Sequence, residues 1–314
     1  MRPGVRFGGA SCSSPVQIGK RKEESEKERK MSNYSRRDFL ALSTTGVACA
    51  SLGMLQGCKT LFASKAKPKI GVQLYSIREL CKSDLVGTLK ALKEIGYAGI
   101  EFAGTYGKSA KELKQLLDDT GLLACGTHAG LDTLKPDKLS ATLDFYSQLG
   151  CPYITVPYLR AKDAAGWIDF AKQCTVAQEV SRKSDIRIGY HNHQHEFREK
   201  IDGVSQFQIF FDNASPEVNM QLDVGHVVAA GEDPLVWMKK YPGRSYTPHA
   251  KEVYPGPGIL GQPGEGKKGV DWDAFFVACE ADVTEWYVVE TEADPKSIEN
   301  VRQCFEFLKA KGRA

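Results

Sequence analysis

Histidine is the most informative residue type in this sequence, because imidazole both binds metal ions and transfers protons near neutral pH. The chain has 314 residues and six histidines. Each histidine lies at or just past the end of a short apolar run that predicts a β-strand. They are His128, His191, His193, His195, His226 and His249. Histidines scattered over a surface or a core would not collect at strand ends, so we interpret them as parts of one site.

Four consecutive predicted strands end in side chains that can donate nitrogen or oxygen to a metal ion. The four endings are His191-Asn192-His193, Asp223-Val224-Gly225-His226, His249-Ala250-Lys251 and Glu290-Thr291-Glu292. Alternation along a strand puts the first and third residues of such a triplet on one face. If these faces point inward, the four strands direct their ligands at one point, as a site for a single divalent ion requires.

Eight strand–helix units must bring these strand ends together. The predicted strands cover residues 70–74, 99–103, 123–127, 153–156, 187–191, 219–223, 246–251 and 287–290. Alternating strands and helices predict a parallel sheet. Eight units, in a body close to the roughly 250 residues typical of the fold, predict a single-domain α/β protein, a (β/α)8 TIM barrel. No GxGxxG motif opens the first unit, so a dinucleotide-binding sheet has little support.

Helix start signals lie between the predicted strands. Ser109 and Glu112 form a capping box, and Asp84 precedes a stripe of leucines. Asp294-Pro295 predicts a helix with Pro295 at its first position. The Gly- and Pro-rich segment 253–270 is irregular, and we expect it to lie over the end of the seventh strand.

The N-terminal part of the chain resembles an export signal. Ser35-Arg36-Arg37-Asp38-Phe39-Leu40 resembles a twin-arginine export motif, and Leu55-Gln56-Gly57-Cys58 resembles a lipobox after a weakly apolar stretch. We therefore expect an over-long, disordered start at 1–30, a signal peptide at 31–58 and the barrel at 59–314. The expected location is periplasmic, or membrane-anchored as a lipoprotein through a lipid on Cys58.

Charge and cysteine content exclude other classes. The first 57 residues have a formal charge of +5 and the whole chain +3, so the body has −2. A slightly acidic body argues against nucleic acid as a partner. The six cysteines of the body have no CxxC spacing, so zinc-ribbon and thioredoxin sites are unsupported and small buried thiols are expected.

Several of these motifs together resemble the xylose isomerase-like superfamily of sugar isomerases and epimerases, over nearly the whole body. The resemblance rests on residues 190–197, on Asp223-x-Gly-His226, on His249-x-Lys251, on Gly264-Glu265-Gly266 and on Val289-Glu290. In that family, Glu, Asp, His and Glu from the last four strands bind one metal ion. The resemblance implies that Asp223, His249 and Glu290 are ligands.

The fifth strand departs from the family pattern. Many members have Glu-Asn-His where this chain has His191-Asn192-His193. His191 is our preferred ligand, with Glu196 or His193 as the alternatives. A shell of His191, Asp223, His249 and Glu290 suits Mn, Co, Zn or Fe better than Mg.

The expected chemistry is removal of a proton next to a carbonyl group that the metal ion polarises. Glu290 is the first choice for the base and His193 the second, while Lys251 would stabilise the enediolate. The predicted substrate-binding residues are Glu101, His128, His226 and Glu196.

Three functions fit these residues. The leading one is a metal-dependent isomerase or epimerase of a small sugar or keto sugar. The runner-up is a lyase, dehydratase or hydrolase-like enzyme that acts on 3-keto sugars or 3-keto glycosides. A non-catalytic periplasmic sugar-binding lipoprotein is the alternative from another class. An apurinic endonuclease would need a DNA-binding face, which an acidic body does not provide.

Overall fold

The structure is a computed structural model that describes residues 66–252, 259–262 and 269–314. The export motif, Cys58 and the expected boundary at residue 30 lie outside the described residues, as does most of the segment 253–270. Within the described ranges, no helix is both long enough and apolar enough to cross a membrane.

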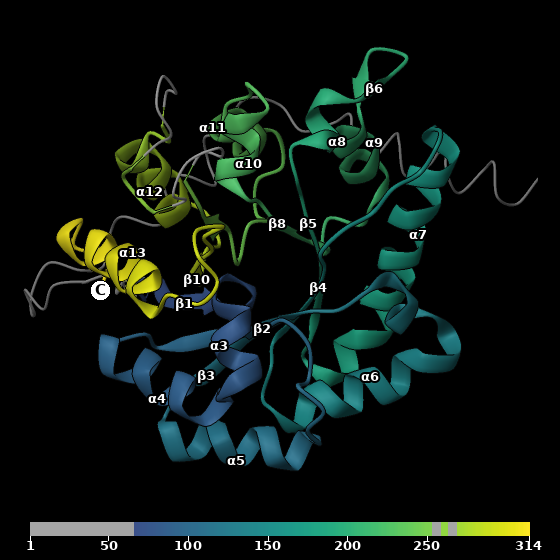
Figure 1. The fold of residues 1–314 in the computed structure, drawn as a ribbon. Helices are drawn as coiled ribbons and strands as arrows, with labels where there is room; N and C mark the ends of the chain where they lie inside the picture. Colours follow the sequence, from purple (N-terminus) through teal and green to yellow (C-terminus); the bar gives the residue numbers. More distant parts are fainter. Residues whose placement is uncertain (1–65, 253–258, 263–268) are drawn as a thin grey trace, which may run out of the picture. The chain divides into compact units, whose positions relative to one another are not determined.

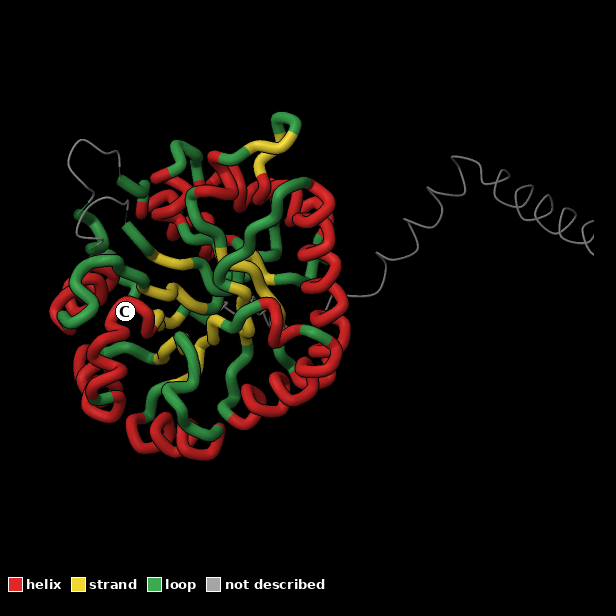
Figure 2. The backbone as a smooth tube through the Cα atoms, turned by 45° about the vertical axis from the view of Figure 1, so that its right-hand side comes forward, coloured by secondary structure: helices red, strands yellow, loops and turns green. Residues whose placement is uncertain are grey.

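Eight parallel strands form the centre of the described part, and helices surround them (Figure 1, Figure 2). The strands are β1 (Lys69–Gln73), β2 (Gly99–Phe102), β3 (Leu123–His128), β4 (Tyr153–Val156), β5 (Arg187–His191), β8 (Asn219–Gln221), β9 (His249–Ala250) and β10 (Trp286–Val289). Their order in the sheet is β8-β5-β4-β3-β2-β1-β10-β9.

A single bridge nearly closes this sheet into a barrel. Asp223, just after β8, forms a parallel bridge with His249 of β9. The backbone N–H of His249 also donates to the carbonyl oxygen of Leu222 at 2.9 Å. The predicted (β/α)8 TIM barrel is confirmed. Two of its predicted metal ligands, Asp223 and His249, form the contact that nearly closes it.

Helices connect the strands on the outside of the sheet. They are α3 (Arg78–Ser83), α4 (Leu85–Ile95), α5 (Ala110–Thr120), α6 (Pro136–Gln148), α7 (Ala164–Ser181), α8 (His195–Arg198), α9 (Gln206–Asn213), α10 (Val224–Ala229), α11 (Pro234–Lys240), α12 (Trp272–Ala281) and α13 (Ile298–Ala310). Three short 3-10 helices, η1 (Leu74–Ile77), η2 (Leu131–Leu134) and η3 (Arg182–Ser184), and a hairpin of β6 (Lys200–Ile201) and β7 (Val204–Ser205) complete the described elements.

Local sequence signals explain where most of these helices begin. The hydroxyl oxygen of Ser109 accepts from the N–H of Glu112, and the Glu112 carboxylate accepts from the N–H of Ser109, so the predicted capping box is present. The Asp84 carboxylate caps α4 as expected. The prediction at Asp294-Pro295 is wrong, because Asp294 closes a separate turn and α13 begins at Ile298 after Ser297.

The strands are almost entirely buried because helices cover their outer faces while polar side chains fill part of the barrel interior. Ile100, Ile154, Ile188 and Val289 are each 0% exposed and belong to the main hydrophobic core. Gln73, Glu101 and Gln221 are also 0% exposed, although they are polar. A buried polar layer of this kind needs internal hydrogen-bond partners, which the site supplies.

Candidate active site

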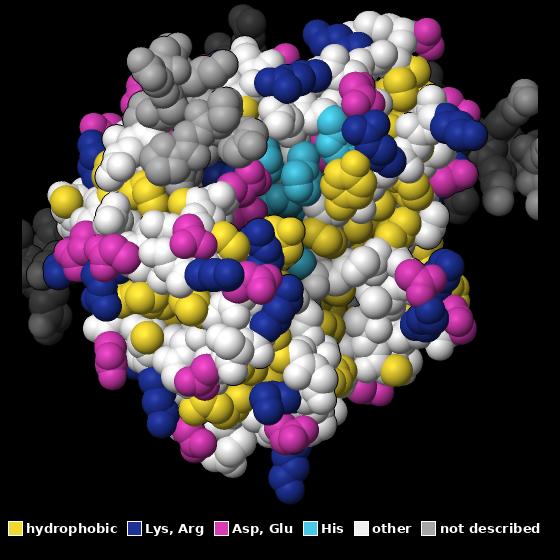
Figure 3. Space-filling view, in the orientation of Figure 1, with side chains coloured by type: hydrophobic (Ala, Val, Ile, Leu, Met, Phe, Trp, Pro, Cys, Tyr) yellow, Lys and Arg dark blue, Asp and Glu magenta, His cyan; other side chains and the backbone are white. Residues whose placement is uncertain are grey.

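A cleft of about 720 Å³ opens at the carboxyl ends of the strands, where TIM barrels carry their active sites. Figure 3 shows histidine side chains gathered in a hollow on this face, beside acidic side chains. The cleft is lined by Tyr75, Arg78, Ala103, Gly104, His128, Pro157, Tyr158, His191, His193, Glu290 and Glu292.

The four predicted metal ligands converge, and two of them, His191 and Glu290, line this cleft while Asp223 and His249 do not. His191, Asp223, His249 and Glu290 are all buried, and each offers a ligand atom within 4.8 Å of the other three. They come from the ends of β5, β8, β9 and β10. These four strands are consecutive neighbours around the barrel, because the bridge between Asp223 and His249 joins β8 to β9. Inward-facing strand ends therefore bring together residues that are up to 99 positions apart in the chain.

Two buried atoms of this group lack hydrogen-bond partners among the described residues, and they show that the group fits a cation. They are Oδ2 of Asp223 and Nδ1 of His191. Burial raises the pKa of Asp223 to about 7, although the nearby positive charge of Lys251 acts to lower it. Burial also lowers the pKa of His191 well below its usual value, which keeps this imidazole neutral. A carboxylate oxygen without a hydrogen bond, 3.9 Å from Nε2 of a neutral imidazole, is a suitable donor for a divalent metal ion beside that ring.

His249 lies between two carboxylates. Its Nδ1 is 2.7 Å from Oε2 of Glu290, and its Nε2 is 2.8 Å from Oε2 of Glu101. Burial alone would lower the pKa of His249, but the two carboxylates raise it to about 10. Without a metal ion, a proton supplies the positive charge that this position favours.

Lys251 and His226 are buried and are not among the residues that line the cleft. The Lys251 ammonium is 1% exposed and donates to Glu290 at 3.2 Å and to Glu292 at 2.6 Å. It also lies 3.0 Å from Nε2 of His226. Burial opposes the charge of Lys251, but Glu290, Asp223 and Glu292 raise its pKa. Lys251 therefore acts on the cleft through the two glutamates that line it.

Glu196 and Glu101 are fully buried and also lie outside the cleft lining. Glu196 accepts hydrogen bonds from the hydroxyl of Tyr190 and from the N–H of His193 at 2.9 Å. Burial raises its pKa to about 8. Glu196 is not part of the group around Asp223, so of the three fifth-strand ligand alternatives the structure places only His191 there.

His128 and His193 line the cleft, as their prediction as site residues required. Burial lowers the pKa of His193 to about 4, so its ring is neutral. His195 instead bonds the carbonyl oxygen of Leu159 at 3.1 Å, away from the cleft lining.

Three cleft residues with aromatic or charged side chains were not predicted from the sequence. They are Tyr75, Arg78 and Tyr158, of which the two tyrosines are 52% and 51% exposed. The Arg78 guanidinium lies 4.4 Å from the centre of the Tyr75 ring. Their signal was position, since all three closely follow the carboxyl end of β1 or β4.

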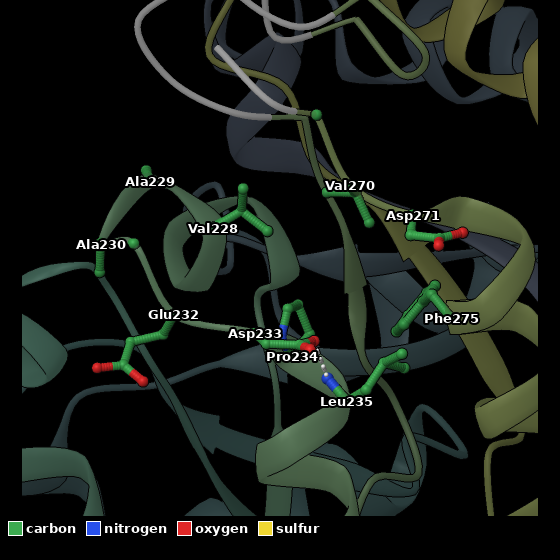
Figure 4. Close-up of a pocket in the computed structure, with 12 residues that line it drawn as sticks. Val228, Ala229, Ala230, Glu232, Asp233, Pro234, Leu235, Val270, Asp271 and Phe275 are labelled. Atoms are coloured by element: carbon green, nitrogen blue, oxygen red, sulfur yellow. Dashed lines mark hydrogen bonds between the residues drawn. The ribbon is translucent and has the colours of Figure 1, made fainter.

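A second cavity, of about 550 Å³, lies beside α10, α11 and the start of α12 (Figure 4). Its lining includes Glu232, Asp233 and Asp271 but no histidine or cysteine. Asp233 caps α11 and Asp271 caps α12. Two of the three carboxylates in this described lining thus have structural roles, and none of the predicted site residues lines this cavity.

Comparisons with known proteins agree with this architecture. The chain is 24% identical over 240 residues to an inosose dehydratase of Bacillus cereus (strain AH820), which covers 64% of this chain and 79% of the relative. It is 26% identical to a solved sugar phosphate isomerase/epimerase of Parabacteroides distasonis ATCC 8503, with a TM-score of 0.66 over 80% of this chain and 96% of that one. The solved IolI protein with a bound zinc atom shares the fold at 15% identity and a TM-score of 0.57.

A family model described as "Xylose isomerase-like TIM barrel" matches residues 89–311. This range runs from α4 to the end of α13 and contains every predicted ligand. The chain therefore belongs to the xylose isomerase-like TIM barrel family.

Proposed function

We propose that this chain is a divalent-metal-dependent enzyme that removes a proton next to the carbonyl group of a sugar or keto sugar. The convergence of His191, Asp223, His249 and Glu290 carries the proposal, because two of them, His191 and Glu290, line an open cleft. The names of the relatives support it, since sugar isomerases and inosose dehydratases both act on polyhydroxylated carbon skeletons. The zinc atom in the IolI protein, which shares the fold, also supports a bound metal ion.

Held by these four side chains, a divalent ion would supply Lewis acidity that makes a C–H bond next to a carbonyl more acidic. The mixed nitrogen and oxygen donors favour Mn, Co, Zn or Fe over Mg. The remaining tasks, which are positioning the sugar and moving its proton, belong to residues of the chain.

His193 is the side chain best placed to take the proton. It lines the cleft, its ring is neutral, and its Nδ1 has no partner among the described residues. Glu290, the other candidate, has one oxygen engaged by His249 and the other by Lys251. A neutral imidazole free of protein partners is the better acceptor, so we assign the base to His193 and leave Glu290 as a ligand.

The part of the cleft wall that carries Glu292 would stabilise negative charge on the substrate through a buried cation. Glu292 lines this wall, is paired with the buried ammonium of Lys251, and lies 3.7 Å from Nε2 of His226. We assign the stabilisation of charge on the substrate oxygens to the buried ammonium of Lys251, which contacts both Glu290 and Glu292. Return of the proton to the neighbouring carbon gives isomerisation, and return to the other face of the same carbon gives epimerisation.

A lyase is the second candidate, and His191 is the observation that favours it. An epimerase gains from carboxylates on both faces of the sugar, but here an imidazole stands at the fifth-strand position. The carboxylates that line the cleft, Glu290 and Glu292, both come from the end of β10. If the substrate carries a leaving group next to the enolised carbon, one base is enough for elimination. The relatives named inosose dehydratase support this route.

The location of the enzyme and the class of its substrate are further parts of the proposal. The Arg36-Arg37 motif and Cys58 favour export and a lipid anchor. An exported enzyme meets glycosides and free keto sugars rather than sugar phosphates. Cell fractionation of the full chain beside an R36K/R37K variant tests this part, because a twin-arginine substrate stays in the cytoplasm when the arginine pair is replaced.

Deuterium exchange tests the shared first step. The full chain, loaded in turn with Mn, Co and Zn, is incubated in D2O with ketohexoses, 3-keto glucose and a methyl 3-keto glucoside, and NMR follows the C–H signal next to the carbonyl. We expect metal-dependent exchange with at least one sugar. A new stereoisomer or aldose identifies an isomerase, and an unsaturated product identifies a lyase. Sugar binding without exchange for any metal would contradict the proposal and favour a binding protein.

A further inference from the structure

Glu101 of β2 is the centre of a buried hydrogen-bond network that contacts the predicted ligand His249. Its Oε2 accepts from Nε2 of Gln73 at 2.6 Å and lies 2.8 Å from Nε2 of His249. Its Oε1 accepts from Nε2 of Gln221 at 2.7 Å. Glu101 is 0% exposed, so it cannot reach a substrate in the cleft.

The surrounding side chains fix the orientation of this carboxylate. Gln73 is in register with Glu101 on the neighbouring strand. Gln221 bonds both Glu101 and, through its Oε1, His128 Nε2 at 2.7 Å. Gln221 also lies 3.2 Å from the hydroxyl of Thr247. Strands β1, β2, β3 and β8 thus hold one carboxylate oxygen pointed at the Nε2 atom of His249.

This contact determines which nitrogen of His249 can bind a metal ion. Only Nε2 faces Glu101, and a carboxylate acceptor requires that this nitrogen carries a proton. Nδ1 is then the atom that faces Glu290 and the predicted ligand group. Many metal-binding histidines are oriented by a carboxylate on their other nitrogen, and losing such a partner typically lowers metal affinity by 10- to 100-fold.

We infer that Glu101 is a positioning residue that holds His249 as the Nε2–H tautomer, so that Nδ1 binds the metal ion. This inference rests on the proposed function, since it needs the metal site. It replaces the expectation that Glu101 touches substrate. Glu101 acts through His249 and remains buried throughout the reaction.

The test measures metal affinity and the tautomer of His249 in the full chain. Chelator competition gives the Kd for Zn2+ and Co2+ in the wild type, E101Q and E101D, with E196Q as a control whose buried carboxyl contacts none of the four ligands. We expect E101Q to raise the Kd by about 10- to 100-fold. E101D keeps the negative charge and should recover part of the loss, while E196Q should keep the wild-type Kd.

Nitrogen-15 NMR of the zinc-loaded protein separates positioning from general damage to the fold. We expect His249 to bind zinc through Nδ1 in the wild type and to keep a slowly exchanging Nε2–H signal that is lost in E101Q. If E101Q does not fold, Q73M takes its place, because it removes one hydrogen-bond donor to Glu101. Q73M should also raise the Kd, by a smaller factor than E101Q. Zinc bound through Nε2, or an unchanged Kd in E101Q, would overturn the inference alone. A wild-type chain that binds no metal ion would overturn the proposed function as well.

Discussion

The six histidines of this chain differ in role because their ring nitrogens have different partners. His249 has a carboxylate at each nitrogen, so it carries a positive charge or binds a cation. Nδ1 of His191, of His193 and of His226 has no partner among the described residues, and burial keeps these rings neutral. Neutral imidazoles are suited to bind a metal ion or to accept a proton.

Replacing His193 tests the assignment of the base at the residue scale. His193→Gln removes the imidazole from the cleft and leaves all four predicted ligands in place. We expect the metal content to stay at the wild-type level while the rate of deuterium exchange falls by about 10²- to 10⁴-fold. Elemental analysis and NMR measure the two quantities on the same sample. Exchange at the wild-type rate would return the role of base to Glu290.

Glu196 predicts a pH dependence of stability. Its pKa is about 8 in the folded chain and about 4.5 when solvent-exposed. Between these values the folded state binds the extra proton, so this group makes the free energy of unfolding fall as pH rises from about 4.5 to 8. E196Q removes the titration and should gain stability relative to the wild type by about 1.4 kcal/mol per pH unit within that range.

Urea unfolding at pH 5, 6.5 and 8 measures this difference. E112Q is the control, because hydrogen bonds from Ser109 hold the pKa of Glu112 below its usual value and it does not titrate in this range. The difference between E112Q and the wild type should therefore stay constant. A constant difference for E196Q as well would show that Glu196 is ionised in the folded chain.

At the element scale, the strand ends were predictable, whereas the contacts below them were not. Short apolar runs followed by His, Asp or Glu predicted the ends of β5, β8, β9 and β10 within about two residues, because a buried parallel strand leaves a clear apolar signal. Glu101 had no such signal for its role. Its partner His249 lies 148 positions away, and only the closed barrel brings the two together.

Two further differences at this scale have physical causes. The start of α13 was predicted at the wrong place, because Asp294 supports a turn as readily as a helix cap. Tyr75 and Tyr158 were missed because a single exposed aromatic residue after a strand has no distinctive spacing. The ligand group was predictable from residue types. The contacts that hold the ligands in place, such as that of Glu101 with His249, could be identified only in the folded structure.

Gly126 of β3 tests how closely the strands must approach to hold Glu101. A Cβ atom at this position would lie 2.8 Å from Oε1 of Glu101, closer than side chains tolerate. G126A should displace this carboxylate, lower stability by about 1–3 kcal/mol and weaken metal binding with it. G130A is the control, because a Cβ atom there meets nothing within 4 Å. Equal metal affinity in G126A and G130A would contradict the proposed positioning.

At the scale of the whole molecule, the barrel buries all six cysteines of the described ranges as thiols, as expected from their spacing. Burial raises the pKa of Cys81 to about 11 and those of Cys151, Cys174 and Cys304 to about 12. We expect iodoacetamide to label none of the six in the native chain and all six in guanidinium. Peptide mass mapping identifies the labelled positions, and native labelling would reveal opening of the barrel wall.

The barrel as a whole has one function in this account, which is to gather ligands from four strand ends around one cation. Asp223 is the most informative ligand to change, because it also bridges to His249 where the barrel closes. Asp223→Asn keeps an oxygen that can cap α10 and removes the charge. Loss of metal in this variant would therefore reflect the ligand and not the fold.

Elemental analysis of the purified full chain, wild type beside Asp223→Asn, shows whether the four strand ends hold a metal ion. We expect about one equivalent of Mn, Co, Zn or Fe in the wild type after reconstitution, and its loss in the variant with the circular dichroism spectrum unchanged. A wild-type chain that holds no metal ion after reconstitution, or a variant that holds as much as the wild type, would contradict this expectation.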